Sequence, residues 1–112
     1  MDITLALKAF AGLSQETRLT AFRILVKNGK RGVAAGALSE KMRIPQNTLS
    51  FHLAHLSQAG LVESRKEGRS VIYFANLDRV QELVQFLLED CCAMDKSTCK
   101  GVEKLMQKAC CP

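Results

Sequence analysis

The cysteines are the residues of this chain with the most distinctive chemistry. The chain has 112 residues and 5 cysteines, and every cysteine lies in its last part: Cys91, Cys92, Cys99, Cys110 and Cys111. A structural disulfide framework normally spreads through a chain and uses an even number of cysteines. Clustered thiolates instead bind soft ions or react with oxidants. The cluster therefore predicts a soft-ion or redox site in the C-terminal segment.

A second group of candidate residues is polar or basic and lies in the middle of the chain. The polar members follow Pro45 and are Gln46, Asn47, Thr48, Ser50 and His52. Such side chains near the start of a helix can reach base edges in the DNA major groove. The basic members are Arg65, Lys66 and Arg69, which flank a predicted hairpin tip and suit contacts with phosphates or the minor groove. His52 and His55 also suggest a metal pair, although such histidines more often pack or contact phosphate.

The distribution of charge favours a polyanionic partner for the first part of the chain. Residues 1–75 carry 11 Lys and Arg against 5 Asp and Glu, whereas residues 76–112 carry 5 against 6. The formal net charge of +5 therefore comes from the first two thirds. A basic surface attracts nucleic acid, although it can also be an ordinary solvated surface.

Length and composition limit the class of protein. A chain of 112 residues with 47% hydrophobic and 24% charged residues fits one folded domain, and it is too short for a Rossmann pair or a TIM barrel. No apolar run reaches the roughly 20 residues of a membrane span, and the start of the chain lacks the features of a secretory signal. We expect a cytoplasmic protein without membrane contact, in which thiols stay reduced.

The periodicity of apolar residues predicts three helices in the first part of the chain. The first covers residues 3–10. The second is capped by Ser14 and ends at residues 28–29, with a buried stripe that contains Leu19, Phe22, Leu25 and Val26. The third covers residues 33–42, and a short break at residues 43–45 follows.

Further elements follow the break. Pro45 suits the start of a fourth helix, whose inner face is expected to be Leu49, Leu53 and Leu56. Residues 61–66 and 70–75 read as two strands joined by a turn at residues 67–69. A fifth helix begins at residue 77 with an apolar stripe wide enough to serve a partner subunit. A last short helix is expected over residues 102–109.

This order of elements is that of a winged helix-turn-helix, a mainly α fold with a β-hairpin. Three segments make the match specific: LSQETRLTAFRILVKNG, PQNTLSFHLAHLSQAGLV and ESRKEGRSVIYF. Through them the chain resembles the ArsR/SmtB family of metal-responsive repressors over roughly residues 5–90. The resemblance implies a homodimeric DNA-binding and dimerisation domain at residues 1–90, with a cysteine-rich inducer-binding tail at residues 91–112.

The chain departs from the two common metal sites of that family. The segment 33–38 lacks the cysteines of one arsenic-binding type, and residues 77–90 lack the histidines of the zinc-binding type. Two smaller departures are Pro45 in place of the usual Ser cap and Arg43 in place of the usual turn glycine. The chain is similar to a third arrangement, in which cysteines at the end of the fifth helix hold trivalent arsenic. That resemblance implies Cys91, Cys92 and Cys99 as ligands, with Cys110 and Cys111 as less favoured candidates.

The resemblance implies a repressor rather than an enzyme. We expect a homodimer, paired through the first and fifth helices, that binds double-stranded operator DNA with an inverted repeat. Arsenite binding to the thiolates would release the operator of a metalloid resistance operon, and antimonite or methylated trivalent arsenic are alternative inducers. A thiol redox switch and a zinc or cadmium sensor are alternatives within regulation. A thiol protein that only buffers ions is the alternative from another class.

Overall fold

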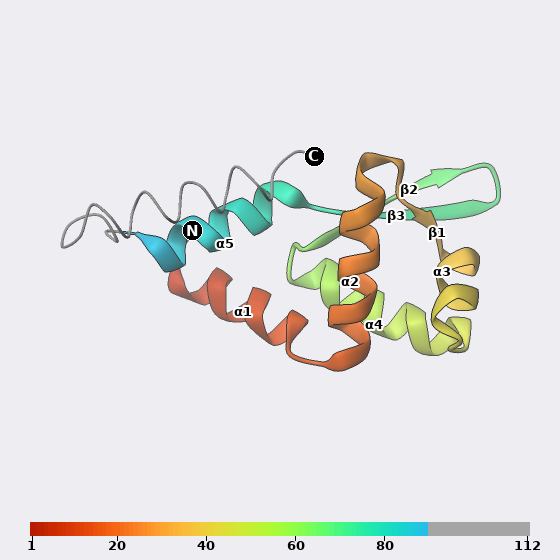
Figure 1. Cartoon of the computed structure of the whole chain (residues 1–112), viewed down its shortest axis with the longest axis horizontal. Helices are drawn as coiled ribbons and strands as arrows, with labels where there is room; N and C mark the ends of the chain where they lie inside the picture. Colours follow the sequence, from red (N-terminus) through yellow and green to blue (C-terminus); the bar gives the residue numbers. More distant parts are fainter. Residues whose placement is uncertain (90–112) are drawn as a thin grey trace.

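The computed structural model describes residues 1–89 of the chain (Figure 1). In chain order its elements are α1 (Ile3–Leu13), α2 (Glu16–Asn28), the 3-10 helix η1 (Gly29–Arg31), β1 (Val33–Ala34), α3 (Ala35–Met42), α4 (Gln46–Gln58), β2 (Val62–Glu67), β3 (Ser70–Ala75) and α5 (Leu77–Leu88). This order confirms the predicted mainly α fold with a β-hairpin. The five cysteines, the expected helix at residues 102–109 and the proposed division after residue 90 lie outside the described residues.

Side-chain caps begin three of the helices. The Asp2 carboxylate accepts a hydrogen bond from the Leu5 N–H at 2.8 Å, and Asn76 Oδ1 accepts one from the Arg79 N–H at 3.2 Å. For α2 the cap is the Gln15 amide oxygen, which accepts from a backbone N–H at 2.8 Å. The prediction of Ser14 as this cap was therefore wrong by one residue. Gln15 has an extended backbone directly before the first turn, and its side chain accepts from a backbone N–H that lacks a partner within the helix.

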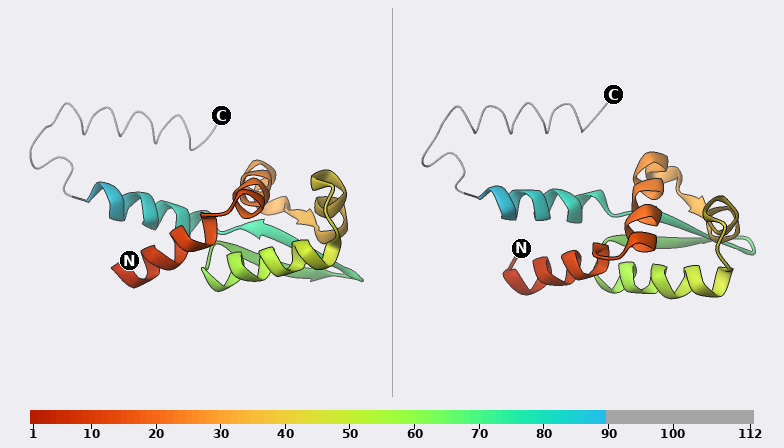
Figure 2. Two further views of the ribbon diagram at one scale, coloured as in Figure 1. Left: turned by 90° about the horizontal axis from the view of Figure 1, so that it is seen from below. Right: turned by 60° about the horizontal axis from the view of Figure 1, so that its bottom comes forward.

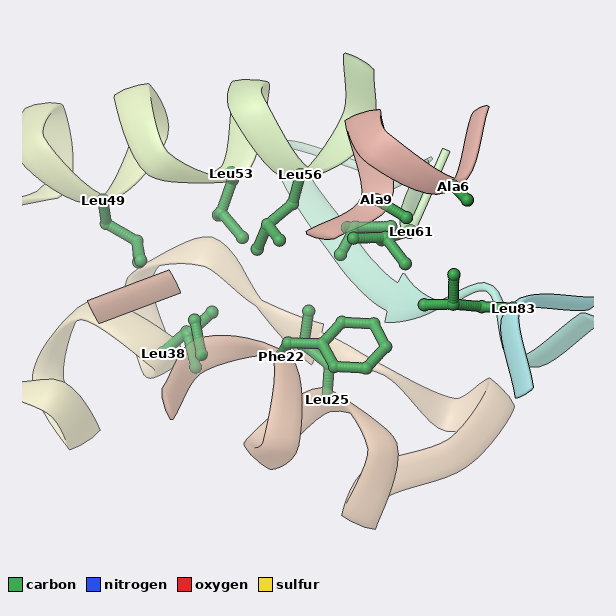
Figure 3. Close-up of a cluster of buried hydrophobic side chains, with 12 residues drawn as sticks. Ala6, Ala9, Phe22, Leu25, Leu38, Leu49, Leu53, Leu56, Leu61 and Leu83 are labelled. Carbon is green, nitrogen blue, oxygen red and sulfur yellow. The ribbon is translucent and has the colours of Figure 1, made fainter. Parts of the chain in front are cut away.

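The core lies between α4 and the helices α2 and α3, and buried residues of α1, the start of β2 and α5 complete it: Ala6, Ala9, Leu61, Val62 and Leu83 (Figure 3). Leu49, Leu53 and Leu56 are each no more than 1% exposed, which confirms the predicted inner face of α4. The predicted stripe of α2 was partly wrong, since Leu19 is 44% and Val26 is 39% exposed. The buried residues of α2 are Ala21, Phe22 and Leu25.

The sheet contains one strand that the sequence did not reveal. Its order is β1-β3-β2, and both pairs are antiparallel. Val33 pairs with Tyr73 and Ala34 with Ile72, so the residues expected to begin the third helix instead extend the sheet. Two residues are too few for periodicity to distinguish a strand from a helix start, and only the partner strand makes this segment extended.

The arrangement of the elements separates two ends of the molecule. Figures 1 and 2 show the amino end of α4 and the tip of the β2–β3 hairpin at one end. The first turn of α1 and the last turn of α5 lie at the other end. Among the helices of residues 1–89, none is long and apolar enough to cross a membrane.

Candidate nucleic-acid interface

The turn between α3 and α4 is held by hydrogen bonds that set the direction of α4. The buried Ser39 hydroxyl donates to the Ile44 carbonyl, and the Ile44 N–H donates back to the Ser39 carbonyl at 3.2 Å. Arg43 adopts a left-handed backbone with φ of 57°, a conformation that glycine adopts at no steric cost. Pro45 is extended and directly precedes α4, as its fixed φ allows. The turn therefore forms without a glycine.

The first two turns of α4 expose a polar surface. Gln46, Asn47, Thr48 and Ser50 are all exposed, so the structure places four predicted DNA-binding residues on one exposed part of the helix. Asn47 Oδ1 accepts a hydrogen bond from the Thr48 N–H at 2.9 Å. The Gln46 amide lies over Gly36 of α3, 3.1 Å from the point where a Cβ would stand. These short side chains leave the amino end of α4 free to approach another molecule.

One exposed residue of α4 was missed in the sequence. The Phe51 side chain is 61% exposed, although it is the largest apolar side chain of the helix. It lies two residues from both Leu49 and Leu53, so at about 100° per residue it projects away from the core. Its exposure could have been predicted from its spacing, because Phe51 does not share the helical spacing of the buried leucines of α4.

His52 lies at a different position from the polar residues. It is half-buried, and its Nδ1 is 3.4 Å from Nη1 of Arg18 on α2. Arg18 also donates from Nε to the Gly12 carbonyl at 2.7 Å, so it joins the end of α1 to α4. Burial, then the charges of Arg18 and His55, lower the pKa of His52. The structure therefore brings His52 to the α1–α2 junction rather than to the exposed polar surface.

The hairpin presents two of its three predicted cations to solvent. Lys66 and Arg69 are exposed, on β2 and in the turn respectively. Glu67 pairs with Ser70, which leaves Gly68 and Arg69 as the turn, and Gly68 has a φ of +61° with open space around it. This confirms the predicted hairpin and moves the end of its first strand by one residue.

Arg65 has partners inside the protein. Its Nη1 donates to the Lys30 carbonyl at 2.7 Å, and its Nη2 donates to the Arg31 carbonyl at 2.8 Å. Its Nε forms an ion pair with Glu67 at 2.9 Å, and its guanidinium carbon lies 5.4 Å from the ring centre of Phe74. Arg65 thus attaches η1 to the hairpin, and a phosphate contact would compete with these bonds.

A metal centre was also sought among the described residues. Within residues 1–89, no three His, Cys, Asp or Glu side chains gather in a way that could hold an ion. His52 and His55 therefore lack a third ligand in this part of the chain. The predicted ligands Cys91, Cys92, Cys99, Cys110 and Cys111 lie outside it, so the thiol site stays a prediction.

Comparisons of sequence place this chain among regulators that bind DNA. Residues 13–65 match the model of a helix-turn-helix domain. An HTH-type transcriptional regulator of Methanocaldococcus jannaschii is 34% identical over 84 residues, which cover 75% of this chain and 92% of that protein. These matches are regulators of transcription, which agrees with the expectation of a DNA-binding protein rather than an enzyme.

Comparisons of structure give the same result. An ArsR-like transcriptional regulator from Rhodococcus sp. RHA1 is 26% identical with a TM-score of 0.64, covering 91% of this chain and 92% of that one. The homodimeric winged helix-turn-helix domain of a possible ArsR-family regulator from Mycobacterium bovis has a TM-score of 0.65 at 23% identity, covering 79% of this chain and 82% of that one. At that identity the second match supports the fold alone.

Proposed function

This chain belongs to the ArsR family of winged helix-turn-helix DNA-binding transcriptional regulators, and from this premise we propose that it is a metalloid-responsive repressor. It acts in the cytoplasm as a homodimer on an inverted-repeat operator. Trivalent arsenic, bound by C-terminal thiolates, releases the operator.

The observation that supports this DNA-binding mode is the shared position of two groups of side chains. The exposed polar residues begin α4, and the exposed Lys66 and Arg69 belong to the hairpin whose tip lies at the same end of the molecule (Figure 2). Polar side chains at the amino end of a helix suit base edges, and cations on a hairpin suit phosphates. We therefore assign base contacts to α4 and backbone contacts to the hairpin.

The apolar surface of α1 supports a homodimer. This helix buries Ala6, Ala9 and Gly12 against its own chain. Its larger apolar side chains are exposed to solvent, including Ile3 at 65% and Leu7 at 62%. A lone subunit would gain by burying the large residues, so this face fits a second copy. Leu87, which is 58% exposed, belongs to the last turn of α5. That turn lies at the same end of the molecule as the first turn of α1 (Figure 1).

The donor chemistry supports a thiophilic inducer. All five cysteines of the sequence follow the DNA-binding elements, between positions 91 and 111. Trivalent arsenic and antimony are soft ions, and thiolates are the donors that suit them. We propose Cys91, Cys92 and Cys99 as ligands for arsenite, with antimonite or methylated trivalent arsenic as related inducers. Cys110 and Cys111 are alternative donors.

The DNA-binding proposal is tested on duplexes selected by the full-length protein from a random library. The selected sequences should contain an inverted repeat whose half-sites lie about one helical turn apart. Lys66→Ala and Arg69→Ala should weaken binding to every duplex. Each lost phosphate contact should also make the slope of log affinity against log salt concentration less steep by about 0.9. Gln46→Ala or Asn47→Ala should instead change the preference at one base position. Failure to enrich any sequence would favour a thiol protein that only buffers ions.

The inducer proposal is tested by DNA release from the same full-length protein. Arsenite should weaken binding to the selected duplex by about 5-fold to 150-fold, the usual range for allosteric coupling, and the duplex should weaken arsenite binding by the same factor. Cys91→Ser with Cys92→Ser should abolish release and leave the affinity without arsenite unchanged. Cys110→Ser with Cys111→Ser is the matched control and should still release.

A panel of other agents separates the alternatives. Release by zinc or cadmium but not by arsenite would identify a divalent-metal sensor that uses the same thiols. Release by peroxide alone, reversed by a reductant, would identify a redox switch. Retention of arsenite-induced release in the Cys91→Ser/Cys92→Ser variant would contradict the proposed ligand set.

A further inference from the structure

Phe51 is a large apolar side chain on the exposed, mostly polar face of α4. Its side chain is 61% exposed, while Leu49 and Leu53 on either side are each 1% exposed. A single exposed apolar residue on a surface is ordinary and needs no explanation. Phe51, however, lies on the helix to which the base contacts are assigned, one turn after Asn47 and next to Ser50.

The ring of Phe51 is held in place by its neighbours. Its centroid lies 4.7 Å from that of His55 and 5.7 Å from that of His52, with interplanar angles of 70° and 69°. These are edge-to-face contacts, which favour one orientation of an aromatic ring. His52 is itself next to Arg18, with 3.4 Å between Nδ1 and Nη1. The ring is therefore a pre-positioned apolar group on the exposed face of α4.

The chemistry of the major groove limits what such a group can recognise. Most features of base edges in this groove are hydrogen-bond donors or acceptors, which an aromatic hydrocarbon cannot satisfy. The apolar feature is the C5-methyl group of thymine, and a phenylalanine ring is one of the side chains that can contact it. We infer that Phe51 is a specificity-determining residue that selects a thymine in each half-site through its methyl group. This inference rests on the proposed function, because it needs α4 to lie in the major groove.

The test uses selected duplexes in which single thymines are replaced by deoxyuridine. This change removes the methyl group and keeps the Watson–Crick pair. At one position per half-site, replacing thymine by deoxyuridine should weaken binding of the full-length protein by about fourfold, the effect expected for one buried methyl-sized group. Phe51→Ala should bind thymine and deoxyuridine duplexes equally. The comparison forms a double-mutant cycle between side chain and methyl group, which separates their contact from other effects of each change.

Two further variants keep the test decisive. Gln58→Ala changes another exposed residue of α4 and should preserve the difference between thymine and deoxyuridine. Phe51→Leu retains an apolar side chain and should preserve part of it. Circular dichroism should show that Phe51→Ala folds, as expected for a residue with 61% exposure.

The outcomes distinguish this inference from the function on which it rests. Strong, salt-dependent binding that no deoxyuridine substitution weakens would overturn the thymine contact and leave the DNA-binding role intact. An equal deoxyuridine effect in wild type and Phe51→Ala would also overturn it, because the methyl group would then act independently of Phe51. If the wild-type protein bound no duplex, both the inference and the proposed function would fail.

Discussion

His52 shows how one side chain connects the stability of the fold to pH. It lies on α4 and faces Arg18 of α2, which in turn donates to the carbonyl of Gly12 at 2.7 Å. Burial is the main reason that the pKa of His52 lies below its ordinary value of 6.5, and the charges of Arg18 and His55 add to the effect. The neutral ring can accept a hydrogen bond from Arg18 through Nδ1, which a protonated ring cannot.

The lowered pKa predicts a loss of stability in mild acid. Below pH 6.5 the unfolded chain protonates this histidine more readily than the folded chain does. The free energy of unfolding should therefore be highest above pH 6.5 and fall as pH decreases toward the folded-state pKa. His52→Gln, which keeps an acceptor, should show a smaller loss between about pH 7.5 and pH 5.5 in urea titrations. An equal loss in wild type and His52→Gln would show that other groups cause the pH dependence.

For single residues, the sequence predicted which side chains are exposed better than it predicted which side chains contact each other. Gln46 and Asn47 were predicted to be exposed because the leucines of the same helix were assigned to its inner face, and the structure agrees. The contact of His52 with Arg18 joins residues 34 positions apart, and no local pattern encodes it. Phe51 was overlooked because an apolar residue next to an apolar stripe is easily grouped with the core.

At the scale of elements, Arg65 links the hairpin to η1. Cross-strand partners share a face of a sheet, and alternate residues face opposite sides. Arg65 pairs with Ile72, whereas its neighbour Lys66 pairs with Val71, so the two cations lie on opposite faces. The guanidinium of Arg65 donates to the carbonyls of Lys30 and Arg31 from its own face. Two adjacent cations thus have different environments.

We predict that Arg65 and Lys66 differ in a measurable way. Arg65→Ala removes hydrogen bonds to η1 and should lower the free energy of unfolding by about 1 kcal/mol, with little change in the salt dependence of DNA binding. Arg65→Lys should restore only part of this stability, because lysine lacks the planar fork that reaches two carbonyls. Lys66→Ala should show the reverse: unchanged stability and a lower salt dependence. A large fall in the salt dependence of Arg65→Ala would instead support the direct phosphate contact expected from the sequence.

The errors in element prediction have a common physical cause. In α2 the larger Leu19 and Val26 were assigned to the core, but the small Ala21 is fully buried beside Phe22 and Leu25. Residue type alone does not show which face the neighbouring helices cover. In β1 the strand exists only because β3 offers hydrogen-bond partners. Both outcomes depend on tertiary contacts, whereas the regular leucines of α4 were sufficient to predict its inner face.

At the scale of the whole molecule, the surfaces proposed to bind DNA and to pair two subunits lie toward opposite ends of the described residues. The amino end of α4 and the hairpin tip form one end, and the first turn of α1 lies at the other (Figure 1). Large apolar side chains of α1 are exposed. The polar start of α4 and the apolar stripe of α5 were predicted from patterns within single elements, whereas a pairing role for α1 was expected from the family resemblance. The separation of the two surfaces follows from the fold, and it allows two copies to meet through one end while each contacts DNA through the other. A two-fold symmetric pair would then match an inverted repeat.

This arrangement predicts that an acidic residue at the apolar end separates the subunits. Leu7→Glu or Leu87→Glu places a charge on a strongly exposed apolar position of α1 or α5, where the native side chains are 62% and 58% exposed respectively. Either variant should sediment as a monomer at concentrations where the wild type is dimeric, because burying an unpaired carboxylate costs several kcal/mol. Val26→Glu changes another exposed apolar residue, on α2, and should remain dimeric.

The same variants test whether pairing is needed for tight DNA binding. A monomer can occupy one half-site, but it loses the gain that comes from linking two binding events, on the order of a 10²-fold or greater increase in affinity. Leu7→Glu should therefore lose most of its affinity for the full inverted repeat and bind a single half-site as wild-type monomers do. A Leu7→Glu protein that sediments as a dimer would exclude α1 from the interface. A monomer with full affinity would show that the two half-sites are read independently.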